Sequence, residues 1–266
     1  MMRKIFTVLL VTVFLQGLIP QTASADISRK GKSTFAADTM LKGIQLKIEE
    51  AFLQSLNLEN DRMLLDLKEK LETSAGDTNH PTITYWQAYL QFYLSLYYLE
   101  TGNRKAASGA IDEGIQLLEK AKGKSSEDYA LLSMLQGFGL QFKGMQAMFI
   151  ASRVKKNAKT AIALDSNNLR AYYVYASNDF YTPEAYGGGK ECEKYLLKAI
   201  SLPVQKEKSD YLPSWGKEES YELLVRYYMR KDKRDLAKKY VHEALREFPD
   251  SYSLKKLEEK LYQIDL

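Results

Sequence analysis

The sequence predicts an all-α protein made of antiparallel helical hairpins that stack on one another. A small residue is followed seven positions later by a second small residue and then by Ile or Leu. Three segments carry this pattern: Ala107, Gly114 and Ile115; Cys192, Ala199 and Ile200; Ala237, Ala244 and Leu245. Seven residues are about two helical turns, so both small side chains lie on one stripe that a neighbouring helix can approach closely. No segment alternates between apolar and polar residues as a strand between hairpin turns would.

Residues 1–25 are expected to be a secretory signal peptide that lies outside the fold. Residues 3–4 are basic, residues 5–18 are nearly all apolar, and Ala-Ser-Ala at 23–25 matches a cleavage site. The apolar run is too short to span a membrane. We therefore expect export to the periplasm with cleavage after Ala25, and no membrane span in the mature chain.

Turn and capping residues divide the mature chain into helices. Gly102 and Gly123 interrupt the apolar periodicity, Ser125 can accept a hydrogen bond from a free amide at a helix start, and Pro203 and Pro249 cannot continue a helix. The helices expected are 36–56, 62–74, 85–99, 104–121, 128–142, 145–164, 169–180, 190–202, 217–230, 233–248 and 251–264. Between them, 181–189 is expected to be an irregular turn and 203–213 an exposed loop.

We group these helices into one domain over 26–266. Its first part, 26–78, holds two atypical helices that lack the small-residue pattern. The repeat pairs follow at 85–122, 128–164, 169–203 and 217–249, where the second pair has only a weak pattern at Val154, Ala161 and Ile162. The last helix, 251–264, has Leu254, Leu257 and Leu261 at helical spacing and a polar outer face, as the end of an open stack requires.

Three of the pairs resemble tetratricopeptide repeats. The clearest copy has Tyr221, Leu224, Tyr228, Ala237, Val241, Ala244, Leu245 and Pro249. The other two have Leu94, Ser95, Tyr98, Gly102, Ala107, Ile111, Gly114 and Ile115, and Tyr172, Ala176, Cys192, Leu196, Ala199 and Ile200. The resemblance implies a right-handed superhelix with a concave groove, and a binding module with no catalytic residues.

The spacing of the copies departs from this family. Successive small residues at 114, 161, 199 and 244 are 47, 38 and 45 residues apart, whereas the family repeat has about 34 residues. Insertions therefore separate the copies, and we expect a distorted stack whose groove is partly filled.

The resemblance places a mixed polar and aromatic face in the groove. The groove candidates are Arg170, Tyr173, Ser177, Phe180, Glu219, Glu222, Arg226 and Met229. Such a face fits another protein or an extended peptide, so an adaptor or envelope-assembly role is the leading hypothesis. The alternative is a small-ligand binder, in which the tyrosine-rich segment and the loop at Gly187 close an aromatic pocket.

A loop with three consecutive glycines is the second candidate site: Tyr186, Gly187, Gly188, Gly189 and Lys190. Its glycines either permit positive φ angles in a lengthened turn or form a contact with a partner. An anion at the following helix start is a third possibility. However, Glu stands at 184 and at 191, where a phosphate loop needs Gly and Ser or Thr.

Enzyme chemistry is not expected. The only histidines are His80 and His242, neither has a second ligand at metal spacing, and no nucleophile motif is present. We therefore expect no metal and no cofactor. The single cysteine, Cys192, occupies a small position of the repeat pattern and is expected to be buried packing.

Net charge also limits the partners. Without residues 1–25 the chain has 36 basic and 34 acidic residues. A balance near +2 creates no long-range field for nucleic acid or an anionic surface. The identity of the partner and the oligomeric state stay open at this point.

Overall fold

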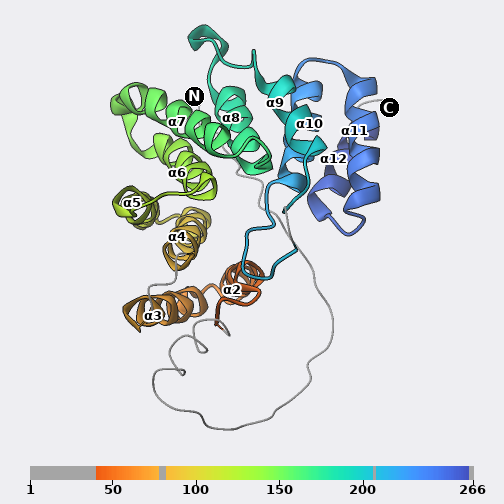
Figure 1. Ribbon diagram of the computed structural model, residues 1–266. Coiled ribbons are helices and arrows are strands. Elements are labelled where there is room, and N and C mark those ends of the chain that lie inside the picture. Colours follow the sequence, from red (N-terminus) through yellow and green to blue (C-terminus); the bar gives the residue numbers. More distant parts are fainter. Residues whose placement is uncertain (1–39, 78–81, 206–207, 264–266) are drawn as a thin grey trace.

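The computed structural model describes residues 40–77, 82–205 and 208–263 (Figure 1). Within these ranges the chain forms eleven α-helices, three short 3₁₀ helices and no strand, which confirms the all-α prediction. The expected signal peptide lies outside the described residues, and so do residues 36–39 of the first expected helix. No described helix has the length and apolar character needed to cross a bilayer.

The helices follow the expected order closely. They are α2 (Ile44–Asn57), α3 (Arg62–Asp77), α4 (Ile83–Glu100), α5 (Arg104–Lys120), α6 (Ser126–Gly139), α7 (Ala147–Leu164), α8 (Leu169–Tyr181), α9 (Cys192–Ser201), α10 (Lys217–Arg230), α11 (Arg234–Glu247) and α12 (Tyr252–Gln263). The short helices are η1 (Leu140–Phe142), η2 (Gly144–Gln146) and η3 (Glu184–Tyr186).

Side chains near the helix starts explain several of these bounds. Asn103 accepts a hydrogen bond from the Ala106 amide at the start of α5. At α6, Ser125 and Asp128 form a reciprocal capping box. Because this box begins the helix at Ser126, α6 starts two residues earlier than expected.

Alternate helices form the inner and outer layers of a curved stack. Figure 1 shows α2, α4, α6, α8 and α10 on the inside and α3, α5, α7, α9 and α11 on the outside. Each inner helix packs on the outer helix that follows it and on the next inner helix, while α12 packs on α10 and α11. This arrangement is the stacked-hairpin architecture that the repeat pattern predicts.

Small residues of the repeat pattern lie at close helix contacts. A Cβ on Gly114 would stand only 3.1 Å from the Gln91 Cβ and 3.2 Å from the Ala88 carbonyl oxygen. Where helices approach this closely, a serine hydroxyl can reach a carbonyl oxygen of the facing helix. The Ser95 hydroxyl of α4 donates a hydrogen bond to the Ala107 carbonyl oxygen of α5 at 2.7 Å. Cys192 has no exposed surface, which confirms its expected packing role.

The segment 203–213 differs from the exposed loop expected from sequence. Its Pro213 is buried and Tyr211 is half-buried, and the chain that follows them buries Trp215. A tryptophan side chain offers a large apolar area, and burying it favours contact between this segment and the helices. In Figure 1 the segment extends from α9 across to α2.

Candidate functional site

Residues 208–216, which we call the strap, cross the inner side of the stack. The Gly43 amide donates a hydrogen bond to the Asp210 carbonyl oxygen at 2.8 Å. The Trp86 indole Nε1 donates to the Tyr211 carbonyl oxygen at 3.1 Å. The strap therefore connects α9 and α10 directly to α4 and to the residues just before α2.

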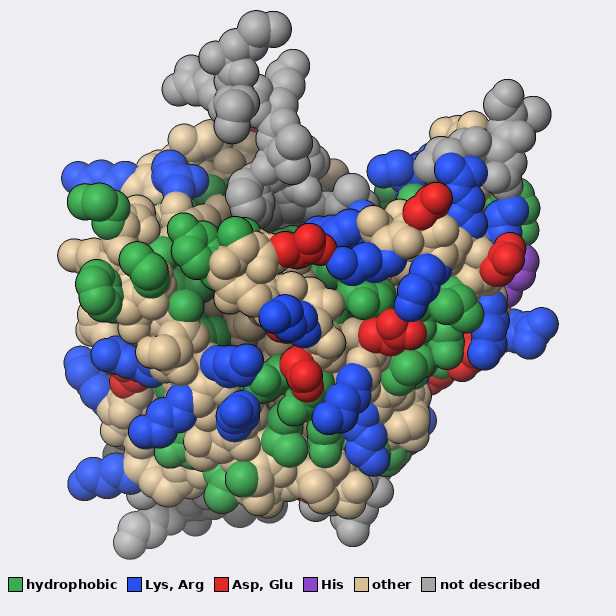
Figure 2. Space-filling model, turned by 90° about the horizontal axis from the view of Figure 1, so that it is seen from above, with side chains coloured by type: hydrophobic (Ala, Val, Ile, Leu, Met, Phe, Trp, Pro, Cys, Tyr) green, Lys and Arg blue, Asp and Glu red, His purple; other side chains and the backbone are tan. Residues whose placement is uncertain are grey.

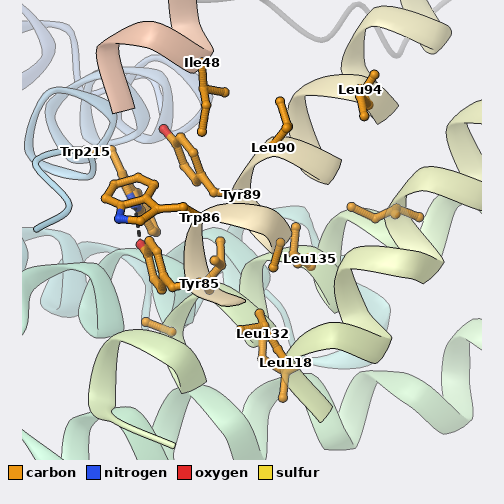
Figure 3. Packing of buried hydrophobic residues seen from close by; sticks show 14 of the residues in the cluster. Ile48, Tyr85, Trp86, Tyr89, Leu90, Leu94, Leu118, Leu132, Leu135 and Trp215 are labelled. Carbon is orange, nitrogen blue, oxygen red and sulfur yellow. Dashed lines mark hydrogen bonds between the residues drawn. The ribbon is translucent and has the colours of Figure 1, made fainter. Parts of the chain in front are cut away.

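Trp215 is the large buried aromatic side chain of the strap. Trp215 is 5% exposed, and its indole Nε1 donates to the Tyr85 hydroxyl at 2.8 Å. Its ring stacks on Tyr89, with centroids 6.3 Å apart, and meets Tyr173 edge-on at 6.1 Å. Figure 3 shows Trp215 beside Tyr85, Trp86 and Tyr89 of α4. Five aromatic residues from two helices and the strap thus form a single cluster.

Arg170 of α8 is part of this internal contact. Its guanidinium makes two hydrogen bonds of 2.6 Å to the Glu127 carboxylate of α6. It also donates to the carbonyl oxygens of Trp215 and Val204 at 3.0 and 3.1 Å. With 4% of its surface exposed, Arg170 binds the chain's own backbone where the sequence analysis expected a partner.

Beyond the strap, half-buried side chains line the inner side of the stack, and we call this surface the inner wall. It comprises Tyr93, Met134, Phe138, Tyr173, Ser177, Glu219, Arg226 and Met229. The residues from α4 and α6 are joined to neighbours by edge-on aromatic contacts, Phe52 with Tyr93 at 5.2 Å and Phe92 with Phe138 at 5.1 Å. On α10, Arg226 pairs with Glu222 at 2.9 Å.

Two carboxyl groups on this side of the stack have pKa values far above the usual range. Burial raises the pKa of Glu49 to about 7, although hydrogen bonds from Gln45 and Tyr89 oppose the shift. Burial also raises the pKa of Glu219 to about 7, and the nearby charges of Glu218 and Glu49 add to the effect. Near neutral pH these groups can therefore accept or donate a hydrogen bond.

The tyrosines of the inner wall stay protonated. Burial raises the pKa of the Tyr93 and Tyr173 phenols well above their ordinary value of 10. They can offer aromatic faces and hydroxyl donors to a ligand. Phenolates, the form that binds metal ions, are disfavoured here.

The predicted groove residues have different surroundings. Tyr173, Ser177, Glu219, Arg226 and Met229 are half-buried on the inner wall. Glu222 and Phe180 are buried, the latter beneath the guanidinium of Arg230 at 3.5 Å. Sequence reasoning missed the α4 and α6 side of the wall. On α4, the spacing of Tyr85, Tyr89 and Tyr93 at successive helical turns could have indicated it.

The glycine loop is a closely bonded turn. Gly187 and Gly189 have φ angles of +84° and +76°, and a Cβ on Gly188 would lie 1.9 Å from the Thr182 carbonyl oxygen. The Asp179 carboxylate accepts hydrogen bonds from the Glu191 and Cys192 amides at 2.8 and 2.9 Å.

These hydrogen bonds bear on the possibility that the loop binds an anion at the start of α9. The Asp179 carboxylate already occupies the amides at the start of α9, where an external anion would bind. The loop's glycines meet conformational needs of the turn itself. From the loop tip, Tyr186 projects outward with 76% of its surface exposed, and Lys190 is also exposed.

One further surface was not anticipated from sequence. At the turn between α6 and α7, Met145, Met148 and Phe149 are 92%, 69% and 79% exposed. The sequence analysis assigned 145–164 to a helix by its apolar residues, and periodicity does not reveal which apolar side chains lack a neighbour.

Comparison with known proteins supports the fold. The HusA haemophore from Porphyromonas gingivalis is similar over 75% of this chain and 96% of its own, with 19% sequence identity and a TM-score of 0.53. The S. pombe nuclear import adaptor Nro1 is similar over 86% and 88% of the two chains, with 13% identity and a TM-score of 0.48. No protein-family model and no curated protein sequence matches. At 19% identity the similarity to HusA shows the all-helical repeat fold alone.

Proposed function

We propose that this chain is a non-catalytic, exported binding protein, a divergent tetratricopeptide-type repeat, whose inner wall holds a compact ligand. The strap is the observation that carries the proposal. It crosses the inner side of the stack where Arg170 and Tyr173 would meet an extended peptide. There Trp215 is buried, its ring meets the Tyr173 ring edge-on, and its carbonyl oxygen accepts a hydrogen bond from Arg170. The remaining wall suits a ligand much shorter than a peptide that follows the whole stack.

The chemistry of the remaining wall favours a flat and largely apolar ligand with a carboxylate. Tyr93 and Phe138 offer aromatic faces, and Met134 offers an adaptable apolar side chain. The Arg226 guanidinium forms an ion pair with Glu222 and could instead pair with a carboxylate of the ligand. Haem has this combination of features, and the similar fold of a haemophore supports it as the first ligand to test.

The test is a hemin titration of the mature chain, followed by the Soret absorbance. We expect saturable binding of one hemin per chain. Ser177 is half-buried on α8, so Ser177→Trp would fill the inner wall and should weaken binding at least about tenfold, which corresponds to about 1.4 kcal/mol. Ser201→Trp, at an exposed position at the end of α9, is the matched control and should bind like the wild type.

Two results would contradict the proposal in different ways. Absence of saturable binding by the wild type would reject haem as the ligand. Equal affinity of the wild type and Ser177→Trp would reject the inner wall as the site, even if hemin binds.

A protein partner is the second candidate, and exposed tyrosines at the glycine loop favour it. Tyr181 and Tyr186 are 61% and 76% exposed on the same turn, and tyrosine is enriched among residues that dominate protein interfaces. A photo-reactive phenylalanine analogue at 186 should then give a discrete cross-linked adduct in cells, whereas the same analogue at Tyr252, 49% exposed on α12, should not. Identical adduct patterns at both positions, or none at either, would contradict this adaptor role.

A further inference from the structure

The exposed face of α7 combines projecting apolar side chains with unpaired cations. Met148, Lys155, Lys156 and Lys159 are all exposed and recur at helical spacing, so they share one side of the helix. The opposite side packs into the stack through Val154, Ala158 and Ala161. Phe149 and the preceding Met145 extend the exposed side at its amino-terminal end.

The charge on this face has one sign. Residues 129–164 contain five basic residues and no Asp or Glu. Among the described residues, the ammonium groups of Lys156 and Lys159 have neither an ion-pair partner nor a hydrogen-bond acceptor, whereas Lys155 lies over the Tyr175 ring at 5.3 Å. In Figure 2, hydrophobic and basic side chains dominate the half above α5 to α7, while acidic side chains lie mainly at the centre and in the other half.

The shape of the face distinguishes between possible occupants. α7 belongs to the outer layer of the stack, Met145, Met148 and Phe149 are exposed at its amino-terminal end, and Lys155, Lys156 and Lys159 border an open hollow further along the helix. A helix that presents large apolar residues beside lysines can lie on a lipid surface, with the apolar groups entering the headgroup layer and the lysines at the phosphates. The near-neutral net charge does not oppose this, since salt screens charges more than about 10 Å away and the local lysines dominate.

We propose that the exposed face of α7, from Met145 to Lys159, docks the protein on an anionic lipid surface without spanning it. This inference is independent of the inner wall, which lies on the other side of the stack. Docking would hold the protein at a membrane with its inner wall still facing solvent.

Vesicle binding tests the proposal. The mature chain should sediment with vesicles of equal parts phosphatidylglycerol and phosphatidylcholine, and much less with phosphatidylcholine alone. Each lysine near an anionic surface contributes about a fivefold increase in partitioning, so Lys156→Gln with Lys159→Gln should reduce binding about 25-fold. The matched control is Lys255→Gln with Lys260→Gln on α12, which should bind like the wild type.

A second variant reports insertion directly. The native tryptophans, Trp86 and Trp215, are buried, so Phe149→Trp adds the single exposed indole of the described residues. Its emission should shift to the blue with anionic vesicles and be quenched by brominated lipids. The proposal is overturned by any of three results: the wild-type protein binds charged and uncharged vesicles equally, it binds no vesicles, or the α7 and α12 variants bind the anionic vesicles equally. An indole at 149 that responds only to an added acidic peptide would assign the face to a protein instead.

Discussion

Truncation of Trp215 to alanine removes the main apolar contact between the strap and the inner wall. A buried tryptophan removes about 150–250 Å² from water, worth about 4–6 kcal/mol at 25 cal/mol per Å². Measured losses for such substitutions are about 3–5 kcal/mol because the site partly relaxes. The Tyr85 hydroxyl also loses its indole donor. We expect the free energy of unfolding to fall by about 4 kcal/mol, and the melting temperature by about 8–16 °C.

Urea unfolding followed by far-ultraviolet circular dichroism measures this loss. Trp215→Phe keeps an aromatic ring but removes the Nε1 donor, and should cost about 1–2 kcal/mol. Leu212→Ala changes an exposed residue of the same strap and should cost less than about 1 kcal/mol. A loss below about 1 kcal/mol for Trp215→Ala would refute the reasoning, because the indole would then contribute no more than an exposed side chain.

Three further predictions follow from the same structure. The pKa values of Glu49 and Glu219 rise from 4.5 to about 7 on folding, so between these pH values the folded chain binds more protons than the unfolded chain. The free energy of unfolding measured in urea should therefore fall as pH rises through this range, by up to about 1.4 kcal/mol per pH unit for each group. Replacing both residues by Gln should flatten this pH profile, and an unchanged profile would contradict the assignment. Gly188→Ala places a Cβ 1.9 Å from the Thr182 carbonyl oxygen and should lower the free energy of unfolding in urea by more than about 2 kcal/mol. Gly187→Ala meets no neighbouring atom and should lower it by about 1 kcal/mol, because of the positive φ angle alone. Equal losses of stability would argue against the clash at Gly188. Burial raises the pKa of the Cys192 thiol to about 12, so Ellman's reagent should react only as fast as the chain unfolds, and rapid labelling of the native protein would show an accessible thiol.

The repeat scaffold could be predicted because its determinants are local in sequence. Gly114 and Cys192 mark close helix approaches at a fixed spacing of two turns, and α10 has the bounds expected from its periodicity. Ends set by side-chain caps were harder to place. For example, α9 begins at Cys192, two residues after the expected start, because the Asp179 carboxylate of a different helix accepts its first amides.

The candidate site depends on contacts between distant residues. Trp215 meets Tyr85 across 130 positions of sequence, and nothing near 203–213 indicates that this segment would bind the inner wall. Of the groove residues predicted on α8 and α10, Arg170, Phe180 and Glu222 are buried by contacts within the chain, and the remaining five stay a prediction. Exposure of Met148 and Phe149 likewise depends on which described elements pack on α7, which local periodicity does not encode. The division into one domain and the secretory signal stay predictions.

Amide hydrogen exchange in the strap most directly tests the central claim that residues 208–216 close part of the inner wall. The Ser214 amide donates to the Gln45 side chain at 2.7 Å, and the Gly43 amide donates to Asp210 at 2.8 Å. If the strap is bound as described, both amides and that of Trp215 should exchange slowly, with protection free energies of several kcal/mol, comparable to those of α4. Exchange of these amides at the rate of an unstructured loop, beside a protected α4, would contradict the account.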